Sequence, residues 1–330
     1  MNSTNTNSVK VTIHPSQFPD VIQRQLIEAL RNSYVPPKFL YDSVYQTQKW
    51  LNVHQSHSPS RIDSDVTLVY DSVFDTVFSQ AKYSDVVLIG LGCGGGQKDA
   101  RCLSKLKLAT RKLYYVPCDV SQSMTLVARS EVGKKLNYNN IYPLVCDLSE
   151  SNDLDQLLDD LLPFSHTRIF TFFGMIPNLE PELILPKLFR ITRDDDDLFF
   201  SVNLVPDGNY LTGVENILPQ YDNEETRDWL LSFLVGIGIP KNAGALVFGI
   251  ESSGDLLRVV ADFRFNHSQV IQIDNKIITF ESGQSLRIFY SYRHTKETLN
   301  KYLDKHGLKI VYSEVSQSGE EGVFRVKRDV

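Results

Sequence analysis

Cysteine is scarce in this chain of 330 residues, and long apolar runs are missing. The four cysteines, none of them in a C-x-x-C pair, are too few in so long a chain for a disulfide-stapled scaffold. No apolar stretch approaches the length of a membrane span, and the N-terminal MNSTNTNSVK lacks the apolar core of a signal peptide and the arginines of a transit peptide. We therefore expect a cytoplasmic protein with reduced thiols and with residues 1–10 disordered.

An excess of positive charge is also absent, since 34 lysines and arginines face 40 acidic residues and the net charge is −6. Phosphate-rich partners require a basic surface, so this balance argues against a nucleic-acid or membrane-surface binder. Hydrophobic residues at 42% and charged residues at 22% are ordinary for a globular protein, and the length allows a large domain with an added cap or insertion. The sequence indicates no metal site and leaves the oligomeric state open.

Glycine, by contrast, is concentrated in one segment. Residues 86–106 read VVLIGLGCGGGQKDARCLSKL, so a β-branched run breaks into five glycines and then becomes helical. A sharp turn at positive φ and a ligand that approaches the backbone both require residues without a Cβ. The glycines, among them Gly90, Gly92 and Gly94, therefore predict a strand, a tight turn and a helix N-terminus close to a ligand. Their G-x-G-x-x-G spacing alone does not identify that ligand, and a ligand-free turn stays an alternative.

The order of the expected elements indicates the fold class. Strand and helix patterns alternate between residues 81 and 205, which is typical of a doubly wound, Rossmann-like α/β sheet. Helical patterns precede this segment, and short strand patterns follow it. The expected parts are an N-terminal helical cap, a cofactor-binding core, a strand-rich insertion that binds the substrate and a C-terminal completion of the core sheet, over residues 1–80, 81–205, 206–285 and 286–330.

Acidic residues end the next two expected strands. Asp119 closes KLYYVPCD and Asp147 closes NIYPLVCD, so both should lie beside the glycine turn, at the carboxyl ends of parallel strands. An acid after the second strand can accept hydrogen bonds from both ribose hydroxyls of a nucleoside, and an acid after the third can hold the adenine amine. The set predicts an adenosine pocket, which fits NAD or S-adenosyl-L-methionine. Asp119 lies further from the glycines than the roughly 20 residues typical of a dehydrogenase.

At this point the chain resembles a family of S-adenosylmethionine-dependent amino-acid methyltransferases. This family is typified by the histidine Nα-methyltransferase of ergothioneine biosynthesis, and its fungal members methylate dimethylallyltryptophan in secondary metabolism. The segments that carry the resemblance are LGCGGGQK from Leu91, VPCDVS from Val116, CDL from Cys146 and GMIPNLEPE from Gly174, with weaker matches in KFLYD from Lys38, PQYDN from Pro219 and SGQSLRIFYSYR from Ser282. The resemblance implies a class I methyltransferase sheet and N-methylation of an amino acid or an amine derived from one.

The resemblance also implies which residues bind the cofactor. Gly92 and Lys98 would contact the amino-acid end of S-adenosyl-L-methionine, Asp119 its ribose, and Asp147 with Leu148 its adenine. The other residues expected beside the cofactor are Gly90, Gly94 and Val120.

The resemblance also implies residues that bind the substrate. Asn178 falls on the asparagine that holds the substrate's amino and carboxylate groups, Tyr221 on a substrate-facing tyrosine and Ser291 on a serine near the substrate side chain. As a mechanistic hypothesis, Asn178 would fix the nucleophilic nitrogen, and Tyr221 or His57 would accept a hydrogen bond or a proton from it. The other residues expected to bind the substrate are Tyr41 and Phe289.

Two departures from the family pattern bear on the substrate. Phe289 stands where the histidine enzymes have a glutamate for the imidazole, and a phenyl ring accepts no such hydrogen bond. The segment HSPSRID from His57 replaces Y-Y-P-T-R-x-E and loses both tyrosines. We therefore expect a substrate that is larger or more apolar than histidine. A nicotinamide-dependent oxidoreductase and a catalytically inactive adenosyl-cofactor-binding protein stay open as alternatives.

Overall fold

The computed structural model describes residues 8–58, 63–79, 81, 83–164, 166–206 and 209–329. Residues 1–7, which account for most of the segment expected to be disordered, lie outside this part, as do Pro59 and Arg61 of the HSPSRID segment.

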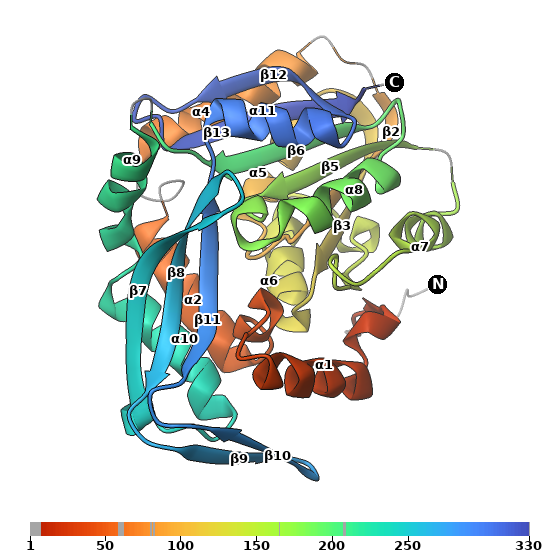
Figure 1. Cartoon of the computed structure of the whole chain (residues 1–330). Coiled ribbons are helices and arrows are strands. Elements are labelled where there is room, and N and C mark those ends of the chain that lie inside the picture. The colour runs from red at the N-terminus through yellow and green to blue at the C-terminus, as the bar shows by residue number, and fades with distance from the viewer. Residues whose placement is uncertain are drawn as a thin grey trace.

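The core is an eight-stranded sheet with the strand order β1-β4-β3-β2-β5-β6-β13-β12 (Figure 1). All neighbours from β1 to β6 run parallel, whereas β13 is antiparallel to β6 and to β12. From β2 the chain continues to β3 and β4 on one side of the sheet and then to β5 and β6 on the other. The sheet is therefore doubly wound, as the sequence predicts. The bounds are β1 (Thr12–Ile13), β2 (Tyr83–Leu91), β3 (Thr110–Asp119), β4 (Leu144–Val145), β5 (Thr167–Phe173), β6 (Asp197–Asn203), β12 (Leu308–Val315) and β13 (Glu321–Arg328).

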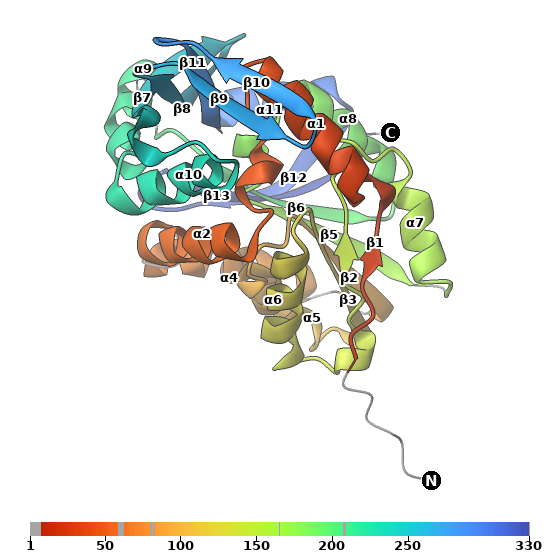
Figure 2. The ribbon, with the colours of Figure 1, turned by 90° about the horizontal axis from the view of Figure 1, so that it is seen from below.

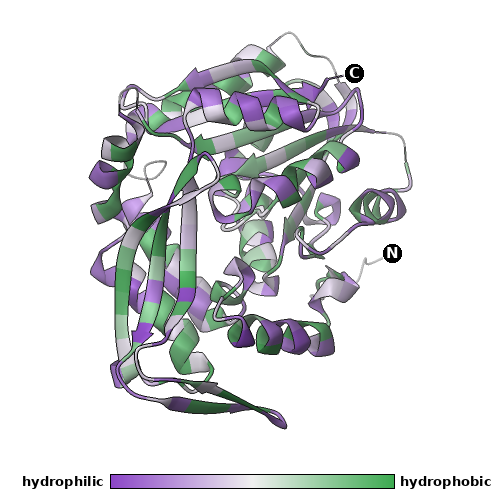
Figure 3. Ribbon diagram, in the orientation of Figure 1, coloured by the Kyte–Doolittle hydropathy of each residue, from purple (hydrophilic) through white to green (hydrophobic). Residues whose placement is uncertain are grey.

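Helices cover both faces of this sheet because its strands are apolar on both sides. Val86 and Leu88 of β2 pack with α4 (Ser64–Phe78) and α5 (Gln97–Leu106), and Val132 of α6 (Gln122–Gly133) joins them. Val87 and Ile89 face the opposite layer. That layer consists of α7 (Leu154–Leu161), α8 (Pro181–Ile191) and α11 (Lys296–Lys305). Figure 3 shows the resulting concentration of hydrophobic residues along the central strands.

A second, antiparallel sheet of three strands, in the order β11-β8-β7, stands beside the core (Figures 1 and 2). Its strands are β7 (Gly244–Ser253), β8 (Leu256–Phe265) and β11 (Ser285–Arg293), and a hairpin of β9 (Gln269–Ile273) and β10 (Lys276–Phe280) extends from it. A strand-rich insertion was expected to end at residue 285. The structure differs, because β11 pairs with β8 along its length and the core resumes only after Arg293.

The N-terminal segment is not one cap. The strand β1 pairs with β4 at the sheet edge, and α4 belongs to the core layer. Between them, α1 (Pro19–Arg31) reaches the β9–β10 hairpin, and α2 (Val44–His57) packs on α10 (Glu224–Gly236). The three-stranded sheet, the β9–β10 hairpin, α10 and α9 (Tyr210–Ile217) are called the second unit below. Hydrophobic spacing predicted helices in this segment, but the partners of each helix are long-range contacts that spacing does not encode.

Arg168 provides a test of the core. Its side chain is buried on β5, where Nη2 lies 2.6 Å from Asp196 Oδ2 and Nη1 lies 2.5 Å from Asp155 Oδ1. Arg168→Met should lower the free energy of unfolding by about 3–5 kcal/mol, because it leaves the buried Asp196 carboxylate uncompensated. Urea unfolding followed by circular dichroism measures this. In the control Lys305→Ala, whose exposed partner is Glu182, the change should stay below about 1 kcal/mol. Equal losses in the two variants would contradict the assignment.

Candidate active site

The glycine turn after β2 has the geometry expected of a ligand-binding loop. Gly92, Gly94 and Gly96 adopt φ values of +66°, +49° and +75°, which side chains with a Cβ rarely tolerate. A Cβ on Gly92 would lie 2.3 Å from the Met175 sulfur, so the turn depends on the missing side chain for space as well. Beneath the turn, Gly90 packs on the buried Asp99 carboxylate, where a Cβ would clash at 2.1 Å. The backbone therefore lies close to the loop that follows β5.

Asp119 lies at the end of β3, next to this turn. Its carboxylate accepts hydrogen bonds from the backbone N–H of Gly94 at 3.1 Å and of Ser121 at 3.0 Å. Val120 is the residue between Asp119 and Ser121 in the chain. Burial raises the pKa of Asp119 to about 6, with the backbone N–H groups opposing the shift. No lysine or arginine of the described residues forms an ion pair with it. The charge therefore has room for further hydrogen-bond donors, such as ribose hydroxyls.

Aromatic side chains cover the turn from the N-terminal segment. The ring of Trp50 on α2 lies against Gly94, with 3.2 Å between its edge and the position of a Cβ. Tyr41 packs on Trp50 and on Trp229 of α10, with ring centroids 5.7 and 5.5 Å apart. Burial is the main cause that raises the pKa of Tyr41, and the negative charge of Asp119 raises it further. Tyr41 thus lies between the glycine turn and the second unit.

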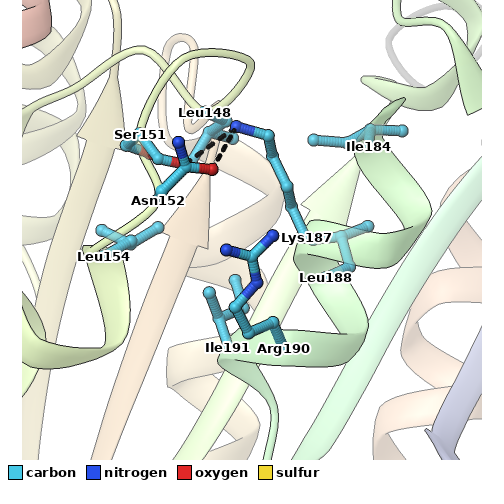
Figure 4. A pocket seen from close by; sticks show the side chains of 9 residues that line it. All are labelled: Leu148, Ser151, Asn152, Leu154, Ile184, Lys187, Leu188, Arg190 and Ile191. Carbon is cyan, nitrogen blue, oxygen red and sulfur yellow. Dashed lines mark hydrogen bonds between the residues drawn. The ribbon is translucent and has the colours of Figure 1, made fainter. Parts of the chain in front are cut away.

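Asp147 is committed to a different partner from the one expected. It follows β4, but its Oδ2 lies 2.7 Å from Lys38 Nζ, and its Oδ1 accepts from the N–H and the hydroxyl of Ser149. The neighbouring Leu148 lines a narrow cavity between α7 and α8, which Lys187 borders (Figure 4). The Asp147 carboxylate therefore already accepts from Lys38 and Ser149, and its contact with adenine stays a prediction.

Lys98 lies on the first turn of α5 and pairs with an acid across the sheet. Its Nζ is 3.2 Å from Glu321 Oε1 and 4.8 Å from the centre of the Tyr70 ring. Glu321 and the Tyr70 ring therefore hold the Lys98 ammonium group.

The expected substrate residues gather where β11 meets the end of β5. Asn178, in the short helix η4 (Ile176–Asn178), donates from Nδ2 to the carbonyl of Tyr290 at 2.7 Å. Next along β11, the Ser291 hydroxyl lies 2.9 Å from the Tyr221 hydroxyl. The ring of Phe289 lies 5.8 Å from that of Tyr221. The structure therefore brings Asn178, Tyr221, Phe289 and Ser291 to one place.

His57 is not part of this group. It ends α2, and its Nε2 lies 3.2 Å from the Glu225 carboxylate, with both side chains substantially exposed. None of the contacts recorded among the described residues joins it to Tyr221 or Asn178. The prediction that His57 accepts the proton therefore finds no geometric support.

Three residues of the site were given no role from the sequence. Trp50 and Trp229 connect the glycine turn to Phe289, since the rings of Trp229 and Phe289 lie 6.0 Å apart. Arg293 donates from Nη2 to the Tyr221 hydroxyl at 2.6 Å. Alternation along a strand places residues 289, 291 and 293 on one face, so this spacing was the signal that could have revealed Arg293.

The residues present fit an adenosyl cofactor. The turn takes the positive φ values of a tight glycine loop, and its Gly94 N–H lies beside the Asp119 carboxylate, which pairs with no lysine or arginine of the described residues. Together with a parallel sheet in which the antiparallel β13 lies between β6 and the edge strand β12, these features define a Rossmann-like class I methyltransferase.

The comparisons agree with this class. The chain belongs to the family of histidine-specific, S-adenosylmethionine-dependent methyltransferases, whose model matches residues 22–212. The resemblance described above is thereby confirmed, as is S-adenosylmethionine as the cofactor, and the oxidoreductase alternative is set aside. No curated protein matches the chain.

Solved structures similar to this chain are S-adenosylmethionine-dependent methyltransferases at low identity. One from Clostridium acetobutylicum shares 13% identity over 86% of this chain and 99% of its own, with a TM-score of 0.44. The magnesium protoporphyrin IX methyltransferase of Synechocystis shares 13% over 87% and 96%, with a TM-score of 0.45. The 1,6-didemethyltoxoflavin-N1-methyltransferase of Burkholderia thailandensis shares 10% over 86% and 86%, with a TM-score of 0.41. In the described part of the chain, no helix combines the length and apolarity required to cross a membrane.

Asp119→Asn should weaken binding of S-adenosylhomocysteine at least about 100-fold, because hydrogen bonds to a charged acceptor contribute more than those to a neutral one. In the unsubstituted protein, affinity should fall as the pH drops through about 6, where the Asp119 carboxylate takes up a proton. Isothermal titration calorimetry from pH 5 to pH 8 measures both effects.

The matched control is Asp99→Asn, because burial also raises the pKa of Asp99 to about 6 and its carboxylate accepts from Tyr115 and Thr171 within the core. This variant should keep the pH dependence of binding. Its loss in Asp99→Asn, with retention in Asp119→Asn, would reject the ribose assignment.

Proposed function

We propose that this protein transfers a methyl group from S-adenosylmethionine to the amine of an amino acid or of a small molecule derived from one. The observation that carries the proposal is the orientation of Asn178. Its Nδ2 donates to the Tyr290 carbonyl, so the amide oxygen is the atom left to accept from a ligand amine. An acceptor at this point suits a nitrogen nucleophile, which brings N–H donors.

The cofactor supplies an already activated methyl group, so the residues of the chain mainly orient the acceptor and exclude water. Asn178 holds the attacking nitrogen from the core side. Tyr221, whose hydroxyl already accepts from Arg293, can donate its own O–H in a hydrogen bond to Ser291 or to a ligand. The buried rings of Phe289 and Trp229 keep solvent away from the acceptor. A neutral amine is required for attack, which favours a dry site with an acceptor for the departing proton.

The substrate is proposed to be other than histidine. The family match ends at residue 212, before Tyr221, Phe289 and Ser291, so the family description does not extend to these residues. Phe289 is 6% exposed and packs between Trp229 and Tyr221. An imidazole there would lack a hydrogen-bond partner, at a cost of about 1–3 kcal/mol. An aromatic or aliphatic side chain would pack without that cost.

The direct experiment uses S-adenosylmethionine labelled on its methyl group and a panel of L-amino acids and biogenic amines. Mass spectrometry of the product should locate the label on the amine nitrogen. Label on an oxygen would reject N-methylation, and cofactor binding without turnover of any acceptor would support the inactive binding protein instead.

Asn178→Ala should leave the affinity for S-adenosylhomocysteine within about twofold and lower kcat/KM for the acceptor about 100-fold, because the amide fixes the reacting nitrogen. Calorimetry and initial rates measure the two effects separately. A parallel loss of cofactor binding and turnover would contradict this role, whereas Asn178→Asp, which keeps an oxygen acceptor, should retain part of the activity.

Phe289→Glu should raise kcat/KM for histidine at least about tenfold relative to the unsubstituted protein, because the carboxylate would accept the imidazole N–H. The matched control is Phe289→Leu, which keeps the site apolar and should leave histidine turnover unchanged. Competition between histidine and an aromatic amino acid measures the change in preference. An unchanged preference in Phe289→Glu would show that residue 289 does not face the acceptor.

A further inference from the structure

The segment from Met175 to Glu180 connects the glycine turn to the second unit. At its start, the Met175 sulfur lies against Gly92, where a Cβ on the glycine would lie 2.3 Å from it. In the middle of the segment, Asn178 donates to the Tyr290 carbonyl. At its end, Glu180 precedes the first turn of α8, and its carboxylate extends to the three-stranded sheet. One short segment thus contacts both halves of the proposed site.

Glu180 makes two hydrogen bonds across this boundary. Its Oε2 accepts from the Tyr292 hydroxyl at 2.6 Å, and its Oε1 accepts from Arg258 Nη1 at 3.1 Å. The same Arg258 nitrogen lies 3.0 Å from the Tyr292 oxygen, so the three side chains form a closed triangle. Burial is the main cause that raises the pKa of Tyr292 to about 12, and the hydrogen bond to Glu180 adds to it. The hydroxyl therefore remains a donor at neutral pH.

The second unit anchors Arg258 with ion pairs of its own. Glu251 Oε1 on β7 lies 2.7 Å from Arg258 Nη2 on β8 and 2.7 Å from Arg287 Nη1 on β11. Arg287 also pairs with Asp262 of β8 at 2.5 Å. The network crosses all three strands, so it holds the Arg258 guanidinium in one orientation. A carboxylate that meets a fixed guanidinium loses less side-chain entropy than one that meets a mobile cation.

This network lies on the opposite face of β11 from the proposed acceptor. Side chains alternate along a strand, so Tyr290 and Tyr292 point away from the face shared by Phe289, Ser291 and Arg293. Glu180 therefore reaches β11 from behind. Its influence on methyl transfer would pass through the backbone that it fixes, because its own carboxylate contacts the rear face of the strand.

We propose that Glu180 is a positioning residue for methyl transfer. Through Tyr292 and Arg258 it holds η4 against β11, which fixes the orientation of the Asn178 amide. The inference rests on the proposed function, in which that amide binds the attacking nitrogen. The packing of Met175 constrains the chain before Asn178, and the bonds of Glu180 constrain it two residues after. An amide held from both sides keeps its oxygen directed at one point, as in-line attack requires.

Hydrogen exchange measures this positioning without an acceptor. In the S-adenosylhomocysteine complex of Glu180→Ala, peptides that cover residues 175–179 should exchange at least about tenfold faster than in the unsubstituted protein, because a contact that fixes them is lost. The matched control Glu182→Gln neutralises a carboxylate two residues further on, which pairs with Lys305 and His306, and should leave this exchange unchanged. Equal exchange in Glu180→Ala and the unsubstituted protein would overturn the proposal.

Turnover separates a positioning role from a structural one. With an acceptor identified by the labelled panel, Glu180→Ala should lower kcat about tenfold, while the acceptor KM and the affinity for S-adenosylhomocysteine stay within about threefold. Glu180→Gln, which keeps an oxygen for the Tyr292 hydroxyl, should recover most of that rate. Tyr292→Phe, which removes the donor and keeps the ring, should reproduce part of the loss. A loss of cofactor affinity as large as the loss of kcat would show a structural role and reject the proposal.

A double variant tests whether the effect passes through Asn178. Glu180→Ala combined with Asn178→Ala should be no slower than Asn178→Ala alone. Two independent effects would instead multiply to a further loss of about tenfold, which would contradict the positioning role.

Failure of the proposed function gives a different pattern. If the unsubstituted protein methylates no nitrogen, the function fails, and faster exchange in Glu180→Ala still supports the hold of Glu180 on η4. Methyl transfer to nitrogen with an unchanged kcat in Glu180→Ala would keep the function and reject the positioning role.

Discussion

The hydrogen bond from Asn178 to the carbonyl of Tyr290 is the contact on which the site depends. Asn178 follows the parallel sheet that carries the cofactor loop, and Tyr290 belongs to the separate antiparallel sheet. This bond fixes the amide so that its oxygen is free for a ligand, and it aligns β11 with the end of β5. Together with the pairing of β11 with β8 and the backbone bonds between Val205 and His294, it positions the residues before and after Tyr290.

Two charged side chains of opposite sign, Asp119 and Arg293, lie at the two ends of this arrangement. Among the residues that the structure describes, Asp119 beside the glycine turn forms no ion pair with a cation, and Arg293 at the far side of the aromatic side chains forms none with an anion. Between them the rings of Tyr41, Trp229, Phe289 and Tyr221 follow one another at 5.5 to 6.0 Å. A site that binds two ligands end to end requires polar groups at its ends that are not already paired within the protein. Groups that are paired would first have to give up their partners.

The sequence predicted the parts of the fold that depend on local pattern. The doubly wound sheet, the glycine turn and the strand-end position of Asp119 all follow from residues near one another in the chain. The contacts that the sequence did not predict involve distant partners. Asp147 pairs with Lys38, β11 pairs with β8 and His57 contacts Glu225, and each contact joins segments that no local pattern connects. Alternation along β11 places Arg293 on one face with Phe289 and Ser291, but its contact with Tyr221 is again long-range.

The separation of the two sheets has an evolutionary consequence. Alternate residues of β11, a strand of the smaller sheet, share one face, and in the proposed function that face is the one toward the acceptor. Under that proposal, single replacements on β11 would change which molecule is accepted without altering the strands of the larger sheet. Such a separation would let related proteins diverge in acceptor while the larger sheet stays the same.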